Sequence, residues 1–421
     1  MSAVGRFVRI ALMLCASWVF CPTASAQGRL SPQEHNRLAA ELRSPMIFFV
    51  AKGPIDACGP GCSTWIAAQG TIGPDTAQRF RDFLAGLNSP DLVSGMGAQK
   101  PPVFFHSPGG KLGQSVEIGR ALRDNRMIAA VGRTILEGCR VSDPGDEACR
   151  RIMQSKGLRS TRLSIADATC ASACVYALAG ASVRRLARGG KLGVHSVNAT
   201  KKPPGFDLKK AVADSHNYLK VYLVEMGIDP ALINLAASIN PKRIHNLSRG
   251  EIRRFNLESQ PYESPWLLHV GAQGESFISK SLTEFTSPSD TYRTTVVRLA
   301  CQRGRVWLTY RREVQASEIG MVLTVSVAAG GEPLRLSLAV SRAGVALNSQ
   351  ETSIDKMLGA AAEPKLEITE EFRLQGPPWT RVAAFSTAGL SDALAKMQPQ
   401  CGAAPKAPEI LTPATSVSGG R

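Results

Sequence analysis

The sequence predicts an α/β domain with largely parallel strands, followed by a small antiparallel β-sandwich domain. Between residues 45 and 260, apolar runs that fit buried strands alternate with stretches of helical periodicity, which is typical of α/β folds. Beyond Pro265 the pattern changes to regular short strands broken by Gly, Pro and Ser, as in β-sandwiches. We therefore expect two domains, residues 27–264 and 265–403.

The first half of the α/β domain contains four apolar runs that predict strands: MIFFVAKG, TWIAAQGTI, PPVFFHS and MIAAVGRTI. Residues 74–87 repeat Phe and Leu at helical spacing, which predicts a helix. Residues 112–122 place apolar residues on one helix face, directly after the turn SPGGK. This order of strands and helices favours parallel pairing.

The second half begins with a polar insert, GCRVSDPGDEACRR, which predicts a loop. We then expect a helix over 172–187, the strand KLGVHS, an amphipathic helix over 207–226, and shorter helices over 229–238 and 248–257. The β domain is expected to contain the strands TYRTTVVRLAC, RVWLTYRRE, MVLTVSVAA, LRLSLAVS and LEITEEFRL, and then one helix in FSTAGLSDALAKM.

Both termini have patterns of their own. Residues 1–26 combine a basic start, an apolar core and a small-residue cleavage motif, which predicts a signal peptide and a periplasmic mature protein. Large residues precede Cys15 and Cys21 where a lipoprotein signal has a small one, so we expect no stable membrane anchor. Residues 404–421 are rich in Pro, Ser and Thr, which predicts a disordered tail.

Eight cysteines remain after the predicted signal peptide, and an exported protein meets an oxidising compartment. Disulfides are therefore the expected use of these cysteines. Sequence spacing groups them as Cys58 with Cys62, Cys139 with Cys149, Cys170 with Cys174, and Cys301 with Cys401. The pairs 139–149 and 301–401 are favoured first. A regular helical geometry would aim Cys170 and Cys174 poorly at each other, so pairing of each with another cysteine, such as Cys58 or Cys62, and a nucleophilic thiol stay open. A further alternative is a zinc site formed by the two Cys-x-x-x-Cys pairs.

The formal net charge is +16, and the basic residues are scattered along the chain. Such a surface suits anionic envelope polymers or lipid head groups, and it also fits an ordinary solvated face. Only 6% of the residues are aromatic, and they do not alternate with basic residues. This composition argues against a protein that binds nucleic acid by base stacking.

Ser172 lies in the stretch DATCASACVYALAG, between two cysteines, where a predicted strand meets a predicted helix. Helix starts offer unpaired N–H groups that suit a developing oxyanion, so Ser172 is a candidate nucleophile. The alternative is a serine that caps the helix through its side chain.

His195 follows 23 residues later, at the end of the next predicted strand. Consecutive parallel strands end at the same edge of a sheet, so His195 is a candidate general base for Ser172. The alternative is a structural histidine. Upstream, Gly109 and Gly110 in SPGG form a strand-to-helix turn whose backbone N–H groups suit an anion.

The order of these elements, SPGG, a serine about 60 residues on and a histidine after it, resembles the Clp protease proteolytic subunit and the wider ClpP/crotonase superfamily. The resemblance covers about residues 45–260. It implies a repeated ββα core, Ser172 as nucleophile, His195 as base, and Gly110 and Ala173 as oxyanion donors. The chain is most similar to exported ClpP-like periplasmic proteins, and its C-terminal part is faintly similar to the β domain of invasion-associated locus B proteins.

One part of the Clp pattern is missing, because no carboxylate precedes Ser248 where the family has its aspartate. The remaining candidates to orient His195 are Asn240, His245 and Asn246. A lysine base is an alternative, because exported relatives in the family that this chain resembles, such as signal peptide peptidase A, use a serine with a lysine. The two lysines near the expected pocket are Lys111 and Lys191.

We therefore expect a periplasmic serine hydrolase, specifically a peptidase that acts on peptides or unfolded protein segments without metal or cofactor. The resemblance to ring-forming Clp subunits leaves a homo-oligomer open. A binding or scaffold protein of the cell envelope, weak or inactive in catalysis, is the main alternative. An acyl-CoA enzyme of crotonase type is a further one.

Overall fold

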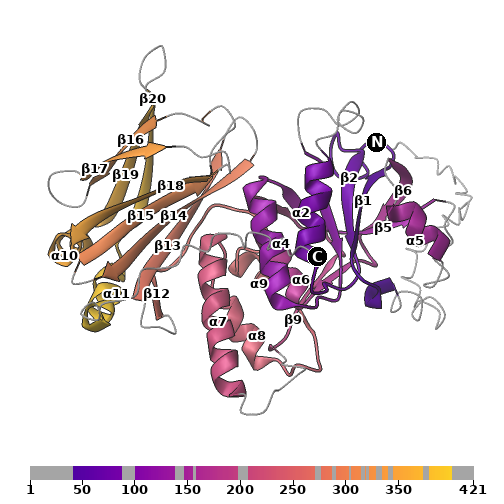
Figure 1. Cartoon of the computed structure of the whole chain (residues 1–421), viewed down its shortest axis with the longest axis horizontal. Helices are drawn as coiled ribbons and strands as arrows, with labels where there is room; N and C mark the ends of the chain where they lie inside the picture. Colours follow the sequence, from indigo (N-terminus) through magenta and orange to yellow (C-terminus); the bar gives the residue numbers. More distant parts are fainter. Residues whose placement is uncertain are drawn as a thin grey trace, which may run out of the picture.

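The computed structural model describes residues 41–87, 100–137, 147–154, 158–197, 207–270, 276–286, 291–302, 305–313, 318, 322–328, 334–339, 345–372 and 379–400. The predicted signal peptide, the predicted tail, Cys139 and Cys401 lie outside these residues. Among the described helices, none is long and apolar enough to cross a membrane. Figure 1 shows an α/β part and a β part joined beside the long helix α7 (Leu208–Glu225).

A seven-stranded sheet forms the centre of the α/β part, in the order β5-β6-β1-β2-β3-β4-β8. From β2 to β8 all neighbouring strands are parallel, whereas β1 and β2 form an antiparallel hairpin. The expectation of a largely parallel α/β sheet is confirmed. The bounds are β1 Ile47–Lys52, β2 Thr64–Gln69, β3 Val103–His106, β4 Ile128–Val131, β5 Arg133–Leu136, β6 Arg159–Ser164 and β8 Val183–Arg185.

The two faces of the sheet are both covered, because successive side chains along each strand point to opposite faces. Phe48 and Val50 of β1 belong to a large core beneath the helices, while Phe49 and Trp65 belong to a smaller core on the other face. The helices are α2 Thr76–Gly86, α4 Leu112–Asp124, α5 Glu147–Gln154, α6 Ala173–Ala179, α7, α8 Leu232–Ser238 and α9 Arg249–Arg254.

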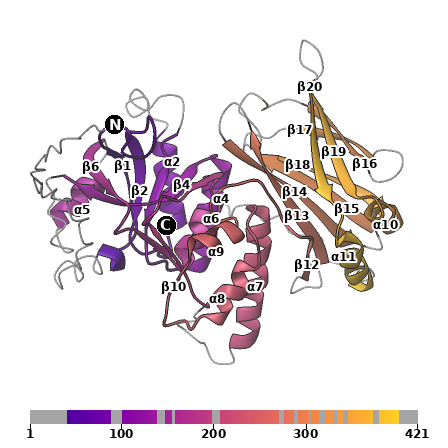
Figure 2. The same cartoon turned by 180° about the vertical axis from the view of Figure 1, so that it is seen from behind.

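A separate three-stranded sheet, in the order β10-β9-β7, lies next to the main one. It consists of β7 Thr169–Ala171, β9 Lys191–Val194 and β10 His245–Asn246, of which β10 is labelled in Figure 2. β7 and β9 are parallel, and β10 runs antiparallel to β9. A parallel bridge between Ser107 and Cys170 joins this sheet to the end of β3.

Three local predictions for the α/β part were wrong. The run MIAAVGRTI forms two strands, because the chain leaves β4 at Gly132 and β5 pairs with β6 instead. The insert predicted as a loop contains α5 in its described part. The helix expected over 172–187 ends at Ala179, because the buried Arg184 donates to the carbonyl oxygens of Ala179 and Ala181 and lies in β8.

The β part consists of two antiparallel sheets that share one apolar core. One sheet has the order β11-β13-β14-β15-β18, with β12 paired to β13, and the other has the order β17-β16-β19-β20. Leu299 and Leu308 from the first sheet and Ile368 and Phe385 from the second belong to the same core. The bounds are β11 Tyr262–Glu263, β12 Leu267–Val270, β13 Ser276–Thr286, β14 Thr291–Gln302, β15 Arg305–Glu313, β16 Val322–Ala328, β17 Leu334–Ala339, β18 Val345–Ser353, β19 Lys365–Phe372 and β20 Trp379–Ser386.

The prediction for this part missed several elements. The strands β12, β13, β18 and β20 and the helix α10 (Ile354–Ala361) were not expected. The helix predicted in FSTAGLSDALAKM is shorter, since Phe385 and Ser386 belong to β20 and α11 spans Leu390–Met397. Polar residues in β18, VALNSQETS, concealed that strand.

The two parts are joined by buried ion pairs at the ends of α4 and α7. Arg123 of α4 contacts Glu313 of β15 at 2.5 Å, and both side chains are almost fully buried. Ser182 donates to the same carboxylate at 3.0 Å. Glu225, the last residue of α7, pairs with Arg298 of β14. These contacts hold the β part against the helices of the α/β part.

Candidate active site

Ser172 has an uncommon backbone conformation, with φ 55° and ψ −124°. Such a conformation costs a non-glycine residue about 1–3 kcal/mol and is concentrated at functional sites. A sharp strand-to-helix turn of this kind exposes a nucleophilic hydroxyl. Ser172 is half-buried, whereas Ala171 and Ala173 are buried. Its side chain makes no capping hydrogen bond to α6, so the alternative of a helix-capping serine is wrong.

The glycine turn after β3 packs directly against Ser172. A Cβ added to Gly109 would lie 2.8 Å from the Ser172 Cβ and 2.8 Å from the Ala173 nitrogen. Gly110 forms a parallel bridge with Ile72, and a Cβ there would lie 2.1 Å from the Ile72 oxygen. Both glycines have positive φ, 99° and 143°. Only glycine therefore fits this close approach of two backbones.

His195 lies beside Ser172 because β7 and β9 run parallel in register. Ala171 pairs with Gly193, and the Ser172 N–H donates to the Gly193 oxygen at 2.7 Å. Ser172 and His195 therefore leave the sheet at the same edge. The sequence predicted this arrangement from the strand–helix–strand order.

A pocket of about 530 Å³ opens at this edge. Five of the residues that the sequence singled out line it together: Ser172, His195, Gly110, Ala173 and Lys111. The other lining residues are Thr71, Ile72, Gly73, Leu112, Tyr176, Ser196 and Val197. Sequence reasoning missed Tyr176, although its place four residues after Ser172 in α6 put it on the same helix face.

One ring nitrogen of His195 lacks a hydrogen-bond partner among the described residues. This nitrogen, Nδ1, is buried. No hydrogen bond among the described residues joins the Ser172 hydroxyl to the ring. Catalytic hydrogen bonds are often long in the free enzyme and shorten when substrate binds.

The three candidate orienting residues lie near His195 and bond elsewhere. The Asn240 side chain accepts from the Lys242 N–H at 2.9 Å. His245 pairs with Val194 across β10 and β9, and its Nε2 contacts Glu251 Oε1 at 2.9 Å. Asn246 pairs with Gly193. An orienting role for any of these three residues therefore stays a prediction.

Glu251 is a carboxylate in this region that sequence reasoning missed. It forms a capping box with Ser248 at the start of α9, and the Ser248 backbone N–H lowers the pKa of Glu251. The signal was the spacing Ser-x-x-Glu, which is typical of a capping box. The carboxylate contacts His245 rather than His195.

The two lysines considered as alternative bases lie in different places. Lys111 is exposed and lines the pocket. Lys191 starts β9 and pairs with Thr169, at the opposite strand end from Ser172. A neutral lysine requires desolvation, which the exposure of both side chains does not provide.

Two predicted disulfides are present, Cys58–Cys62 and Cys170–Cys174. These four sulfurs are therefore used in disulfides rather than as the thiolates of the alternative zinc site. Cys149 and Cys301 are also disulfide-bonded. Because Cys139 and Cys401 lie outside the described residues, the pairings 139–149 and 301–401 stay predictions.

Comparisons with known proteins give only distant similarities. No family model matches the chain, and no curated protein matches it. A mutant of a membrane-bound stomatin-specific protease has 15% identity and a TM-score of 0.27, over 45% of this chain and 74% of that one. A second mutant of that protease, in complex with a substrate peptide, has 13% identity and a TM-score of 0.27, over 50% and 72%.

A third solved structure with distant similarity is of a different protein. The invasion associated protein B of Bartonella henselae has 14% identity and a TM-score of 0.23, over 31% of this chain and 90% of that one. All of these TM-scores are low. The assignment of the site therefore rests on the geometry of this chain.

Proposed function

We propose that the protein is a serine hydrolase, specifically a peptidase that cleaves peptides or unfolded protein segments through an acyl-enzyme. The observation that carries this proposal is the positive φ of Ser172, whose hydroxyl caps no helix and lines one pocket with His195 and Gly110. Strain of this kind persists only where the surrounding structure holds it. In the predicted periplasm, such an enzyme has no ATP-dependent unfolding partner, which favours unfolded substrates.

The pocket residues divide the steps of the proposed reaction among them. The Ser172 oxygen attacks the substrate carbonyl while His195 takes the hydroxyl proton. The backbone N–H groups of Gly110 and Ala173 donate to the oxyanion that forms. His195 then gives its proton to the leaving amine, and water, deprotonated by His195, hydrolyses the ester on Ser172.

The test is hydrolysis of fluorescently labelled casein, an unfolded protein, and of short peptide esters. We expect Ser172→Ala to lower kcat at least about a thousandfold, because the nucleophile is lost. His195→Ala is expected to lower kcat by about 10²–10⁴-fold. Ser196→Ala is the matched control, since Ser196 lines the same pocket and has no role in the reaction. Equal turnover by wild type and Ser172→Ala would contradict the proposal.

A second candidate is a binding protein that keeps this fold without turnover. The unpartnered Nδ1 of His195 favours it, because an unoriented imidazole is a poor general base. In that case labelled casein binds wild type and the double variant Ser172→Ala/His195→Ala with equal affinity, and neither protein cleaves it. Fluorescence anisotropy measured beside turnover separates the two functions.

A further inference from the structure

The Cys170–Cys174 disulfide spans the candidate nucleophile symmetrically. Cys170 lies in β7, two residues before Ser172, and Cys174 lies in α6, two residues after it. The two Cα atoms are 5.2 Å apart, and both residues are fully buried. A regular helix would aim these side chains poorly for a bond. The sharp turn at Ser172 brings the strand residue and the helix residue face to face instead.

The segments on either side of Ser172 are anchored to different elements. β7 is held by Ser107, whose N–H donates to Thr169 and whose oxygen accepts from Ala171, at 2.7 and 2.9 Å. α6 packs against α4, where Gly180 and Gly119 meet at backbone contact. Between these anchors, the disulfide closes a short covalent ring that contains Ser172. A ring of this kind restricts the conformations open to the enclosed residue.

We propose that the Cys170–Cys174 disulfide is a positioning element that holds Ser172 in its positive-φ conformation, so that the hydrolase reaches its full kcat only with this pair oxidised. This inference rests on the proposed function. Without the bond, Ser172 is free to relax to negative φ, which moves its hydroxyl and the Ala173 N–H away from the oxyanion position. The chain is then folded with a misplaced nucleophile.

The oxidation is a thiol–disulfide exchange. The two thiols of Cys170 and Cys174 lose two protons and two electrons, and a protein disulfide of an exchange partner takes them up and becomes a dithiol. The first thiolate attacks the partner's disulfide to form a mixed disulfide, and the second thiolate releases the partner. Because the folded pair is fully buried, exchange takes place before the core closes over it.

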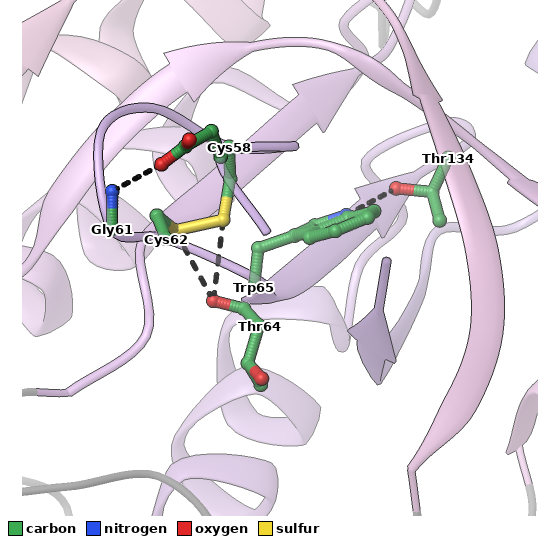
Figure 3. Close-up of a disulfide and its surroundings, with 7 residues drawn as sticks. Cys58, Gly61, Cys62, Thr64, Trp65 and Thr134 are labelled. Atoms are coloured by element: carbon green, nitrogen blue, oxygen red, sulfur yellow. Dashed lines mark hydrogen bonds between the residues drawn. A yellow bond between two sulfur atoms is a disulfide. The ribbon is translucent and has the colours of Figure 1, made fainter. Parts of the chain in front are cut away.

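The chain contains a matched control disulfide with the same spacing. Cys58–Cys62 also joins residues four apart, with Cα atoms 5.1 Å apart. It lies in the loop between β1 and β2, where both sulfurs contact the Thr64 oxygen (Figure 3). Its residues are partly exposed, and neither lines the pocket. The two bonds therefore differ in place rather than in type.

The experiment compares Cys170→Ala/Cys174→Ala with Cys58→Ala/Cys62→Ala in casein turnover. We expect the first variant to lose about tenfold to hundredfold in kcat. Without the disulfide, Ser172 must return to its strained conformation in each turnover, and the free energy of that conformation adds to the activation barrier. Its KM should stay within about twofold of wild type, because uniform substrate binding is unchanged. The control variant should keep wild-type kcat. Circular dichroism confirms that both variants are folded.

Refolding of the reduced, unfolded wild type at increasing ratios of oxidised to reduced glutathione gives a second route that needs no substitution and lets each disulfide form before the core closes. Alkylation and mass spectrometry of the fragments Leu163–Arg184 and Gly53–Arg79 report each disulfide separately. Activity should fall with the fraction of Cys170–Cys174 that is reduced and be unaffected by loss of Cys58–Cys62. A folded protein without the Cys170–Cys174 bond and with full kcat would overturn the inference. An inactive wild type would instead contradict the proposed function.

Discussion

At the scale of single residues, His106 connects the strand before the glycine turn with β7, the strand that directly precedes Ser172. Its Nδ1 accepts from the Thr169 N–H at 3.2 Å, and its side chain is fully buried. Burial lowers the pKa of His106 from 6.5 to about 3. Between pH 6.5 and about 3, the His106 imidazole is therefore neutral in the folded protein, whereas it is protonated in the unfolded chain.

The neutral His106 predicts that stability falls with acid. Between pH 6.5 and about 3 the unfolded state binds a proton that the folded state does not, so the free energy of unfolding decreases as pH falls. The expected slope from this group is about 1.4 kcal/mol per pH unit. His106→Asn should remove that slope, because an amide oxygen can still accept from Thr169 and does not titrate. Urea unfolding at pH 7, 6 and 5 measures it.

The control for this prediction is His216→Asn, which removes a more exposed histidine on α7 and should leave most of the slope in place. An unchanged slope in His106→Asn would mean that another group accounts for the acid sensitivity.

The shared position of Ser172 and His195 in one pocket was predictable because it depends on local order. A serine at a strand-to-helix corner and a histidine at the next strand end reach one edge in any parallel unit. The absence of a partner for the His195 Nδ1 among the described residues was not predictable in this way. The residues that lie beside β9 are decided by its pairing with β10, which is about 50 residues away in sequence.

At the scale of elements, α4 and α6 cross at two glycines, Gly119 and Gly180. A Cβ on Gly119 would lie 1.9 Å from the Tyr222 hydroxyl, which donates to the Tyr176 oxygen at 2.8 Å. Both helices begin at the pocket, so this crossing sets the distance between the Gly110 turn and Ser172. Tyr176 lines the pocket and so connects the crossing with the site.

This crossing predicts that Gly119→Ala destabilises the protein. The added methyl group overpacks the contact with Tyr222, which costs about 1–3 kcal/mol. Gly113→Ala, in the same helix, is the matched control, because its Cβ would meet nothing within 4 Å. That change should raise stability by about 0.5–1 kcal/mol through the helix preference of alanine. Denaturant unfolding measures both variants, and equal effects would contradict the close crossing.

The elements themselves were predicted unevenly. Apolar runs such as β1 and β3 and the long helix α7 have clear periodicity, and they were found. β8 was mistaken for helix because Val183 and its neighbours continue an apolar run from α6. The strand forms because Arg184 is buried among carbonyl oxygens that lie up to 73 residues away in sequence, which no local pattern reveals.

At the scale of the whole molecule, the β part is fixed to the helices that begin at the site. Arg123, near the end of α4, binds Glu313 of β15, while the start of α4 follows Gly110. A buried ion pair between residues 190 apart cannot be read from local sequence. The change of composition near Pro265 indicated the boundary between the two parts, but it did not predict the ion pair that connects them.

In the proposed function, Ser172 is a nucleophile activated by His195. The most direct measurement is the site of a fluorophosphonate adduct, mapped by mass spectrometry on the fragment Leu163–Arg184. The account predicts an adduct on Ser172 in wild type, none on this fragment in Ser172→Ala, and labelling at least about a hundredfold slower in His195→Ala. No adduct on wild type, or equal labelling of wild type and Ser172→Ala, would contradict it.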